Sequence, residues 1–210
     1  MVDVLKNLKN IKASISNSNT NIIAVSKTFP IDKVKPLYEV GHLHFGENKV
    51  QEAKMKWASV KQLNPKLKLH MIGKLQSNKA KDAVALFDYI HSLDNEKLAN
   101  ALAKSEKLLN KKNKYFIQVN IGKEEQKSGI RVDQIFGFYN FCQKILIDVI
   151  GLMCIPPIDK NPKEYFTELV KLNKSLKLKE ISMGMSSDYL KAVDCGSTFV
   201  RIGSAIFGNR

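Results

Sequence analysis

Short apolar runs alternate with longer amphipathic stretches from one end of the chain to the other. Eight of these runs have the length and the bounding polar or turn-forming residues that are typical of β-strands. The predicted strands are residues 22–25, 43–45, 69–72, 89–91, 115–121, 149–153, 180–182 and 199–202. The first of them, with isoleucine, alanine and valine in an unbroken run, has the character of a strand buried in a parallel sheet.

The stretches between the strands carry apolar residues at helical spacing. The clearest is 95–110, where leucines recur on one face. An opening helix is predicted over residues 2–18, with one apolar face made of Val4, Leu5, Leu8 and Ile11. Another helix is expected to start at Asn161, which can serve as the cap before Pro162 at the first helical position.

Eight strands, each followed by a helix, indicate a single (β/α)8 TIM barrel. We expect one domain over residues 1–210, with residues 1–20 as an N-terminal helix that packs on the barrel. The chain is short for this fold, so its helices and loops must be brief. An open doubly wound sheet uses the same alternation and is the structural alternative.

Composition limits the classes of protein that the chain can belong to. At 210 residues and 44% hydrophobic content it can bury a full core, and no run approaches the roughly 20 apolar residues of a membrane span. The N-terminus lacks the pattern of a signal peptide. The three cysteines form neither a CxxC pair nor an even set, so a cytoplasmic location without disulfides is expected.

The net charge of +14 raises the question of nucleic-acid binding. Nearly all the basic residues are lysines spread along every predicted helix, whereas arginine, the usual reader of bases and phosphates, occurs only at Arg131, Arg201 and Arg210. Aromatic residues are not interleaved with the basic ones as a stacking platform requires. We therefore interpret the charge as a solvated lysine-rich surface, with no nucleic-acid or membrane partner.

Lys27 is the first candidate for chemistry, because it lies where the apolar strand 22–25 leaves the sheet. A lysine that is half desolvated at the end of a buried strand has a lowered pKa and a larger fraction of neutral amine. The neutral amine is the nucleophile that forms an imine with a carbonyl compound. A lysine at a strand end by chance is the alternative in a chain with so many lysines.

The segments after the last two strands indicate an anion site. In barrels, phosphate is frequently held by the loops after strands seven and eight. Gly184 and Gly203 allow the backbone to approach an anion, and Ser186 and Ser204 add hydroxyl donors at the expected starts of two helices. Helix capping alone is the alternative role of these serines.

Arg201 lies two residues before Gly203 and therefore on the same face of its strand. An inward arginine in an apolar strand must meet an acceptor or an anion. Together with Lys27 and the phosphate cradle, this arginine indicates a phosphorylated aldehyde with a ring heteroatom, which describes pyridoxal 5′-phosphate (PLP). No HExxH motif or close Cys/His group is present; we interpret His42, His44, His70 and His91 as strand-end or loop residues and predict no metal.

A series of motifs in this order resembles the pyridoxal phosphate homeostasis protein family, which is similar to the N-terminal domain of alanine racemase. The motifs are AVSK at 24–27, FGEN at 45–48, IGKLQSNK at 72–79, KSGI at 127–130, GLM at 151–153, SMGMS at 182–186, VRIG at 200–203 and IFG at 206–208. They cover the chain from about residue 21 to its end, and their combination is far more specific than any one of them.

The resemblance implies a PLP-binding barrel of fold type III without the racemase C-terminal domain. It implies that Lys27 carries the cofactor as an aldimine, that Ser186, Gly203 and Ser204 hold the phosphate, that Arg201 faces the pyridine nitrogen and that Asn48 lies beside the cofactor. The family commonly has Thr at position 204 and often Pro or His at position 74, where this chain has Ser204 and Lys74. The loop 122–129 belongs to the pattern, but no cofactor contact is assigned to it.

The resemblance further implies a function in intracellular PLP homeostasis without catalytic turnover, with apo forms of PLP-dependent enzymes as possible recipients. An arginine opposite the pyridine nitrogen keeps that nitrogen unprotonated and the ring a weak electron sink. The chain also ends at Arg210, which leaves no room for a second domain to supply another base, and on the same ground we expect a monomer. A PLP-dependent amino-acid racemase is the main alternative, and a Schiff-base aldolase is the third.

Overall fold

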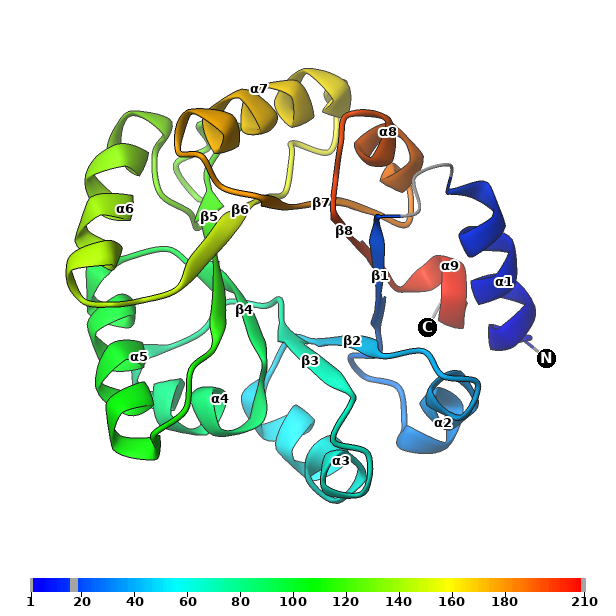
Figure 1. Cartoon of the computed structure of the whole chain (residues 1–210). Coiled ribbons are helices and arrows are strands. Elements are labelled where there is room, and N and C mark those ends of the chain that lie inside the picture. Colours follow the sequence, from blue (N-terminus) through cyan, green and yellow to red (C-terminus); the bar gives the residue numbers. More distant parts are fainter. Residues whose placement is uncertain (1, 16–18, 209–210) are drawn as a thin grey trace.

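Eight parallel strands form a closed barrel in the computed structural model, which describes residues 2–15 and 19–208. Each strand pairs with its neighbours in the sequence, and the last pairs with the first (Figure 1). The strands are β1 (Asn21–Val25), β2 (His44–Glu47), β3 (Lys68–Met71), β4 (Tyr89–Leu93), β5 (Lys114–Val119), β6 (Val149–Cys154), β7 (Glu180–Met185) and β8 (Phe199–Ile202). The predicted (β/α)8 barrel is therefore confirmed, and the open doubly wound sheet is excluded.

Helices surround the barrel and cover its outer face (Figure 1). They are α1 (Val4–Ser14), α2 (Ile31–Glu39), α3 (Val50–Leu63), α4 (Ala80–Leu86), α5 (Glu96–Leu109), α6 (Ile135–Lys144), α7 (Pro162–Ser175), α8 (Tyr189–Asp194) and α9 (Ser204–Phe207), with short 3-10 turns at Ser77–Lys79 and Val132–Gln134. The predicted start at Asn161 is confirmed, because its side chain accepts a hydrogen bond of 3.2 Å from the Lys163 amide.

The opening helix is shorter than predicted. Helix α1 begins after Asp3, whose carboxylate accepts from the Lys6 amide, and ends at Ser14; residues 16–18 lie outside the described residues. Its buried face is Val4, Leu8 and Ile11, whereas Leu5 is 39% exposed and does not belong to that face. The helix lies beside α9 (Figure 1), and the Asn7 side chain donates a 3.0 Å hydrogen bond to the Ile206 carbonyl.

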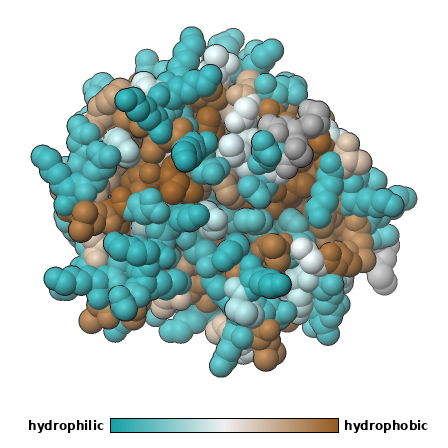
Figure 2. Space-filling model, viewed as in Figure 1, coloured by the Kyte–Doolittle hydropathy of each residue, from teal (hydrophilic) through white to brown (hydrophobic). Residues whose placement is uncertain are grey.

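Two apolar regions stabilise the barrel. The larger one lies between the strands and the helices, and a smaller one inside the barrel is formed by Ile23, Phe116, Met153 and Phe199. Polar and charged side chains cover most of the face seen in Figure 2, as the lysine-rich sequence requires. No helix in the described part of the chain is both long and apolar enough to cross a membrane.

The interpretation of the histidines as strand-end or loop residues is wrong for two of them. His44 begins β2 and is a strand-end residue, but His70 and His91 lie within β3 and β4. The side chains of His70 and His91 are fully buried and hydrogen-bonded to each other, which places them inside the barrel. Strand alternation explains the placement, because the neighbours Leu69 and Met71 point outward to the helix layer.

Candidate functional site

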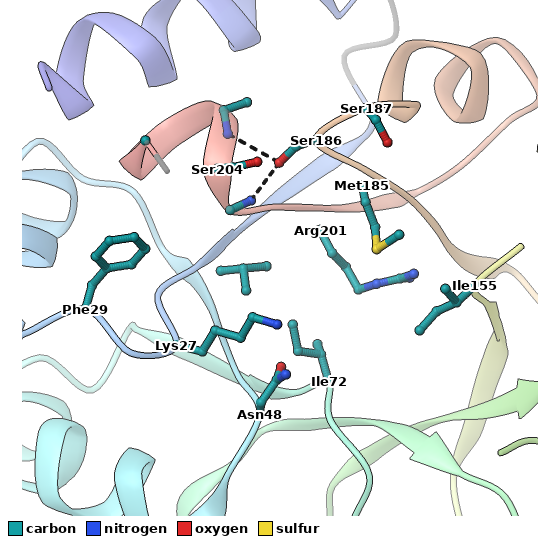
Figure 3. Close-up of a pocket in the computed structure, with 14 residues that line it drawn as sticks. Lys27, Phe29, Asn48, Ile72, Ile155, Met185, Ser186, Ser187, Arg201 and Ser204 are labelled. Carbon is teal, nitrogen blue, oxygen red and sulfur yellow. Dashed lines mark hydrogen bonds between the residues drawn. The ribbon is translucent and has the colours of Figure 1, made fainter. Parts of the chain in front are cut away.

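A cavity of about 820 Å³ opens where β1, β2, β7 and β8 end. All six residues predicted from the sequence line it: Lys27, Asn48, Ser186, Arg201, Gly203 and Ser204. Figure 3 shows Lys27 and Asn48 on one side of the cavity and the two serines on the other, with Arg201 between them and the barrel interior. The apolar part of the lining includes Phe29, Ile72, Ile155 and Met185.

Lys27 and Asn48 are held by a polar clamp on the outer side of the strands. The buried carboxylate of Glu47 accepts hydrogen bonds on Oε1 from Ser26 Oγ (2.7 Å), Trp57 Nε1 (2.9 Å) and Lys56 Nζ (2.9 Å). Because Ser26 and Glu47 directly precede Lys27 and Asn48, these bonds join the ends of β1 and β2 and fix the start of both loops. Ser26 and Glu47 occur in the motifs AVSK and FGEN, but the sequence pattern alone does not indicate this role.

Gly73 allows the loop after β3 to approach Asn48 closely. A Cβ atom at position 73 would lie 2.4 Å from the carbonyl oxygen of Asn48, so any side chain would displace this backbone. Thr28 adopts a positive φ of 67°, a conformation that turns the chain sharply after Lys27. Both features place the backbone around the cavity mouth in positions that the strand pattern alone does not specify.

Arg201 points into the barrel, and only 4% of its surface is exposed. Its Nη1 donates to Ser182 Oγ at 2.7 Å, and its Nη2 donates to the carbonyl oxygen of Cys154 at 2.8 Å. The predicted need for an inward acceptor is therefore confirmed. Burial lowers the pKa of the Arg201 guanidinium from its ordinary value, which makes these two acceptors important for keeping it charged.

The two serines lie at the junction of the loops after β7 and β8. Ser186 Oγ accepts hydrogen bonds from the amides of Gly203 (3.2 Å) and Ala205 (3.3 Å), drawn as dashed lines in Figure 3. These bonds do not use the hydroxyl hydrogen of Ser186, which stays a donor. Ser204 begins α9, so its hydroxyl and the amides around it lie at the same end of the cavity.

Two local expectations about this cradle are wrong. Ser186 does not open the helix after β7, because α8 begins at Tyr189; Asp188 instead closes the preceding turn by accepting from the Met185 amide. Gly184 is absent from the described cavity lining; its φ of +91° and a would-be Cβ only 2.5 Å from Ala192 show that it serves close packing against α8. Only Gly203 of the two glycines lines the cavity.

The loop 122–129 lies at a separate depression of about 760 Å³, lined among others by Lys123, Glu125, Lys127 and Arg131. None of its described residues lines the first cavity. Within the described chain, no group of three or more His, Cys, Asp or Glu side chains is arranged to hold a metal ion.

The fold and the cavity define a barrel of the class described as "Alanine racemase, N-terminal domain", whose family pattern matches residues 3–210. A pyridoxal phosphate homeostasis protein from Pasteurella multocida is 38% identical over an alignment of 210 residues. The alignment covers 95% of this chain and 90% of that protein. This chain belongs to the pyridoxal phosphate homeostasis protein family.

Solved structures agree with this membership. The structure of PipY from Synechococcus elongatus without PLP has a TM-score of 0.91 and 34% identity, covering 98% of this chain and 100% of that one. The structure of PipY with PLP bound has a TM-score of 0.90 and 33% identity over the same shares. Alanine racemase from Clostridium difficile shares the fold alone, with 17% identity, a TM-score of 0.76, and coverage of 99% of this chain and 56% of that chain.

Proposed function

We propose that this chain binds pyridoxal 5′-phosphate in the cavity at the ends of β1, β2, β7 and β8, and acts in intracellular PLP homeostasis. The observation that carries the proposal is the convergence of an amine, a guanidinium and a hydroxyl-amide cradle on one cavity. A relative with 33% identity and the same fold has a solved structure with PLP bound, which supports this choice of ligand.

The groups that line the cavity match the phosphate, the ring and the ring nitrogen of PLP in turn. A phosphate needs several hydrogen-bond donors, and the hydroxyls of Ser186 and Ser204, with the amides near Gly203, supply them at one end of the cavity. A flat aromatic ring needs apolar walls, which Ile72, Ile155 and Met185 can provide. The ring nitrogen of such a cofactor is an acceptor, and Arg201 carries N–H groups beyond the two that bond to the protein.

Lys27 is the residue that would hold the aldehyde end. When bound, the cofactor supplies an aldehyde that condenses with an amine, together with a ring that can delocalise charge. Asn48 faces the same space as Lys27 and would orient the ring substituents by hydrogen bonding (Figure 3). The protein's own contribution is then to position the cofactor, to exclude water with its apolar lining, and to fix the charge at the ring nitrogen.

A reversible hold on PLP suits a protein that supplies apo forms of PLP-dependent enzymes, working in the cytoplasm as a monomer. Measurement of the molecular mass of the loaded protein in solution tests the monomeric state. Mixing the loaded protein with an apo-enzyme and following the activity of that enzyme tests the transfer of PLP.

Replacing Lys27 by Ala should abolish covalent attachment of PLP. The wild-type protein should show an absorbance band near ~420 nm and a borohydride-trapped adduct on Lys27, which are general properties of this cofactor on a lysine. Peptide mass spectrometry after reduction identifies the lysine. Lys49→Ala is the matched control, because Lys49 is exposed and follows Asn48 without lining the cavity. A trapped adduct that persists on another lysine in the Lys27→Ala protein would contradict the assignment.

Replacing Ser186 or Ser204 by Ala should weaken PLP binding while sparing pyridoxal, which lacks the phosphate. Each change removes one charge-assisted hydrogen bond, worth about 1.5–3 kcal/mol when buried, so the dissociation constant should rise roughly tenfold or more. Titration of each variant with both ligands provides its own control. Equal losses for PLP and pyridoxal would assign these serines to packing of the loops instead.

A further inference from the structure

A continuous row of hydrogen-bonded side chains crosses the barrel interior behind Arg201. His44 Nδ1 lies 2.9 Å from His70 Nε2, and His70 Nδ1 lies 2.9 Å from His91 Nε2. His91 Nδ1 lies 2.9 Å from Ser182 Oγ, the atom that accepts from Arg201 Nη1. We call His44, His70, His91 and Ser182 the interior row; its members come from β2, β3, β4 and β7.

Aromatic rings enclose the interior row. The His70 ring stacks on Tyr89 with centroids 4.3 Å apart, and the His91 ring stacks on Phe116 at 4.3 Å. Phe199 lies within 6.3 Å of all three histidine rings. His70, His91 and Ser182 have no exposed surface, so their polar atoms depend on one another for hydrogen bonds.

The polarity of the row follows from its Arg201 end. A guanidinium has donors only, so Ser182 Oγ must accept from it. In the described chain, His91 is the other hydrogen-bond partner of Ser182 Oγ. The buried hydroxyl hydrogen is satisfied only if it points to His91 Nδ1, which makes His91 the Nε2–H tautomer.

The same reasoning passes along the row. His91 Nε2–H donates to His70 Nδ1, and His70 Nε2–H donates to His44 Nδ1. The opposite polarity would leave the hydroxyl hydrogen of the buried Ser182 without an acceptor among the described residues, which is costly. His44 is partly exposed and lines a second cavity of about 380 Å³ around the amino-terminal ends of β1 and β2, so the last N–H of the row can reach water.

Arg201 needs such support. Burial lowers its pKa and would favour loss of charge or a turn of the side chain toward water. A chain of aligned hydrogen bonds polarises its members cooperatively, and this chain presents its acceptor end to the guanidinium. An apolar filling of the same space would supply no acceptor at all in place of Ser182.

We propose that the interior row consists of positioning residues that hold Arg201 charged and oriented toward the cofactor ring, with its histidines kept neutral as Nε2–H tautomers. The inference rests on the proposed function, because it gives Arg201 its cofactor role. It adds a set of residues that do not line the cavity and act on the electrostatic environment of the ring nitrogen through Arg201. The row connects this site to the opposite mouth of the barrel.

The tautomers are measured first, in the protein without cofactor. Nitrogen-15 NMR of the histidine rings should show protonated Nε2 and unprotonated Nδ1 for His70 and His91 at neutral pH. Nδ1–H tautomers or imidazolium rings at these positions would overturn the proposal. This measurement needs neither a variant nor bound PLP, so it decides the row's polarity even if the wild-type protein binds no PLP and the proposed function fails.

Variants then test the effect on the cofactor. Ser182→Ala and His91→Phe should each weaken PLP roughly tenfold and shift the absorbance band of bound PLP, because Arg201 loses its acceptor or the support of that acceptor. His91→Gln keeps one donor and one acceptor and should recover much of the affinity. Phe116→Leu is the control, since it perturbs packing against His91 and leaves the hydrogen bonds intact.

The comparison with the control separates positioning from packing. Weaker binding and a shifted band in Ser182→Ala and His91→Phe, with both near wild type in Phe116→Leu, support the proposal. A wild-type band in both row variants, or the same change in all three proteins, overturns it. If the row variants fail to fold, the tautomers of the wild-type protein carry the decision.

Discussion

Acidification from pH 7 to pH 5 should lower the free energy of unfolding by up to about 8 kcal/mol, before most carboxylates titrate. The cause is the four histidines, which are buried or nearly so. Burial, the largest cause, lowers the pKa of His42 and His44 from 6.5 to about 4 and the pKa of His70 and His91 well below 6.5. The folded protein therefore keeps these rings neutral in a range where the unfolded chain protonates them.

Neighbouring charges mostly add to the effect of burial. Lys12 lies near His42, Lys68 near His44, Lys61 near His70 and Arg201 near His91, and each of these cations lowers the histidine pKa further. The rings also oppose one another's protonation, while Asp88 near His44 acts in the opposite direction.

The sign follows from proton linkage. Because the folded pKa values lie below the unfolded one, the unfolded state binds more protons as the pH falls from 6.5 toward 4. The contribution of the neutral histidines to the free energy of unfolding is fully present above pH 6.5 and is lost as the pH falls through this window. Each histidine contributes a slope of up to about 1.4 kcal/mol per pH unit.

Urea denaturation at closely spaced pH values between 7.5 and 5 measures this slope. His42→Gln should reduce the slope by about one quarter, because it removes one of the four titrating rings. His42 lies outside the interior row, so this change leaves the hydrogen bonds of the row intact. An unchanged free energy of unfolding across the window would show that the histidines protonate equally well in the folded state.

The barrel could be predicted because its signal is repeated along the chain. Eight apolar runs with helical patterns between them leave few alternatives, and strand ends then identify one face of the barrel as functional. Asn48 and Gly203 each follow a strand directly and Lys27 lies two residues after one, so their convergence needed only the parallel arrangement of the strands.

The interior row could not be found in that way, since a single histidine in an apolar strand is ambiguous. The sequence signal for the row was the even spacing of its histidines from cavity residues, because residues two or four positions apart in a strand lie on the same face. His44 precedes Asn48 by four residues and His70 precedes Ile72 by two, so each shares a face with a cavity residue. Joining them required the register between β2, β3, β4 and β7, which depends on packing of the whole barrel. The start of α8 was missed for a local reason, because Asp188 rather than Ser186 closes the preceding turn.

An amino acid bound together with PLP should exchange its α-proton with solvent deuterium more slowly than ~1 s⁻¹, the lower end of ordinary turnover. Removal of this proton needs a base beside the α-carbon, and racemisation needs one on each face. Among the described residues that line the cavity, Lys27 and Arg201 have the only titratable side chains. Arg201 cannot act as a base near neutral pH, so Lys27 alone is available and serves one face.

The charge at the ring nitrogen acts in the same direction. The Arg201 guanidinium opposes a second positive charge beside it, so the ring accepts electrons less readily from a carbanion. Mass spectrometry of alanine incubated with the loaded protein in deuterium oxide, followed by chiral chromatography, measures exchange and racemisation separately. Exchange faster than ~1 s⁻¹ with equal loss of chirality would make a racemase the better description and require a second base. Slow exchange that disappears in Lys27→Ala, together with transfer of PLP to an apo-enzyme, would identify Lys27 as a holder of the cofactor with only residual reactivity.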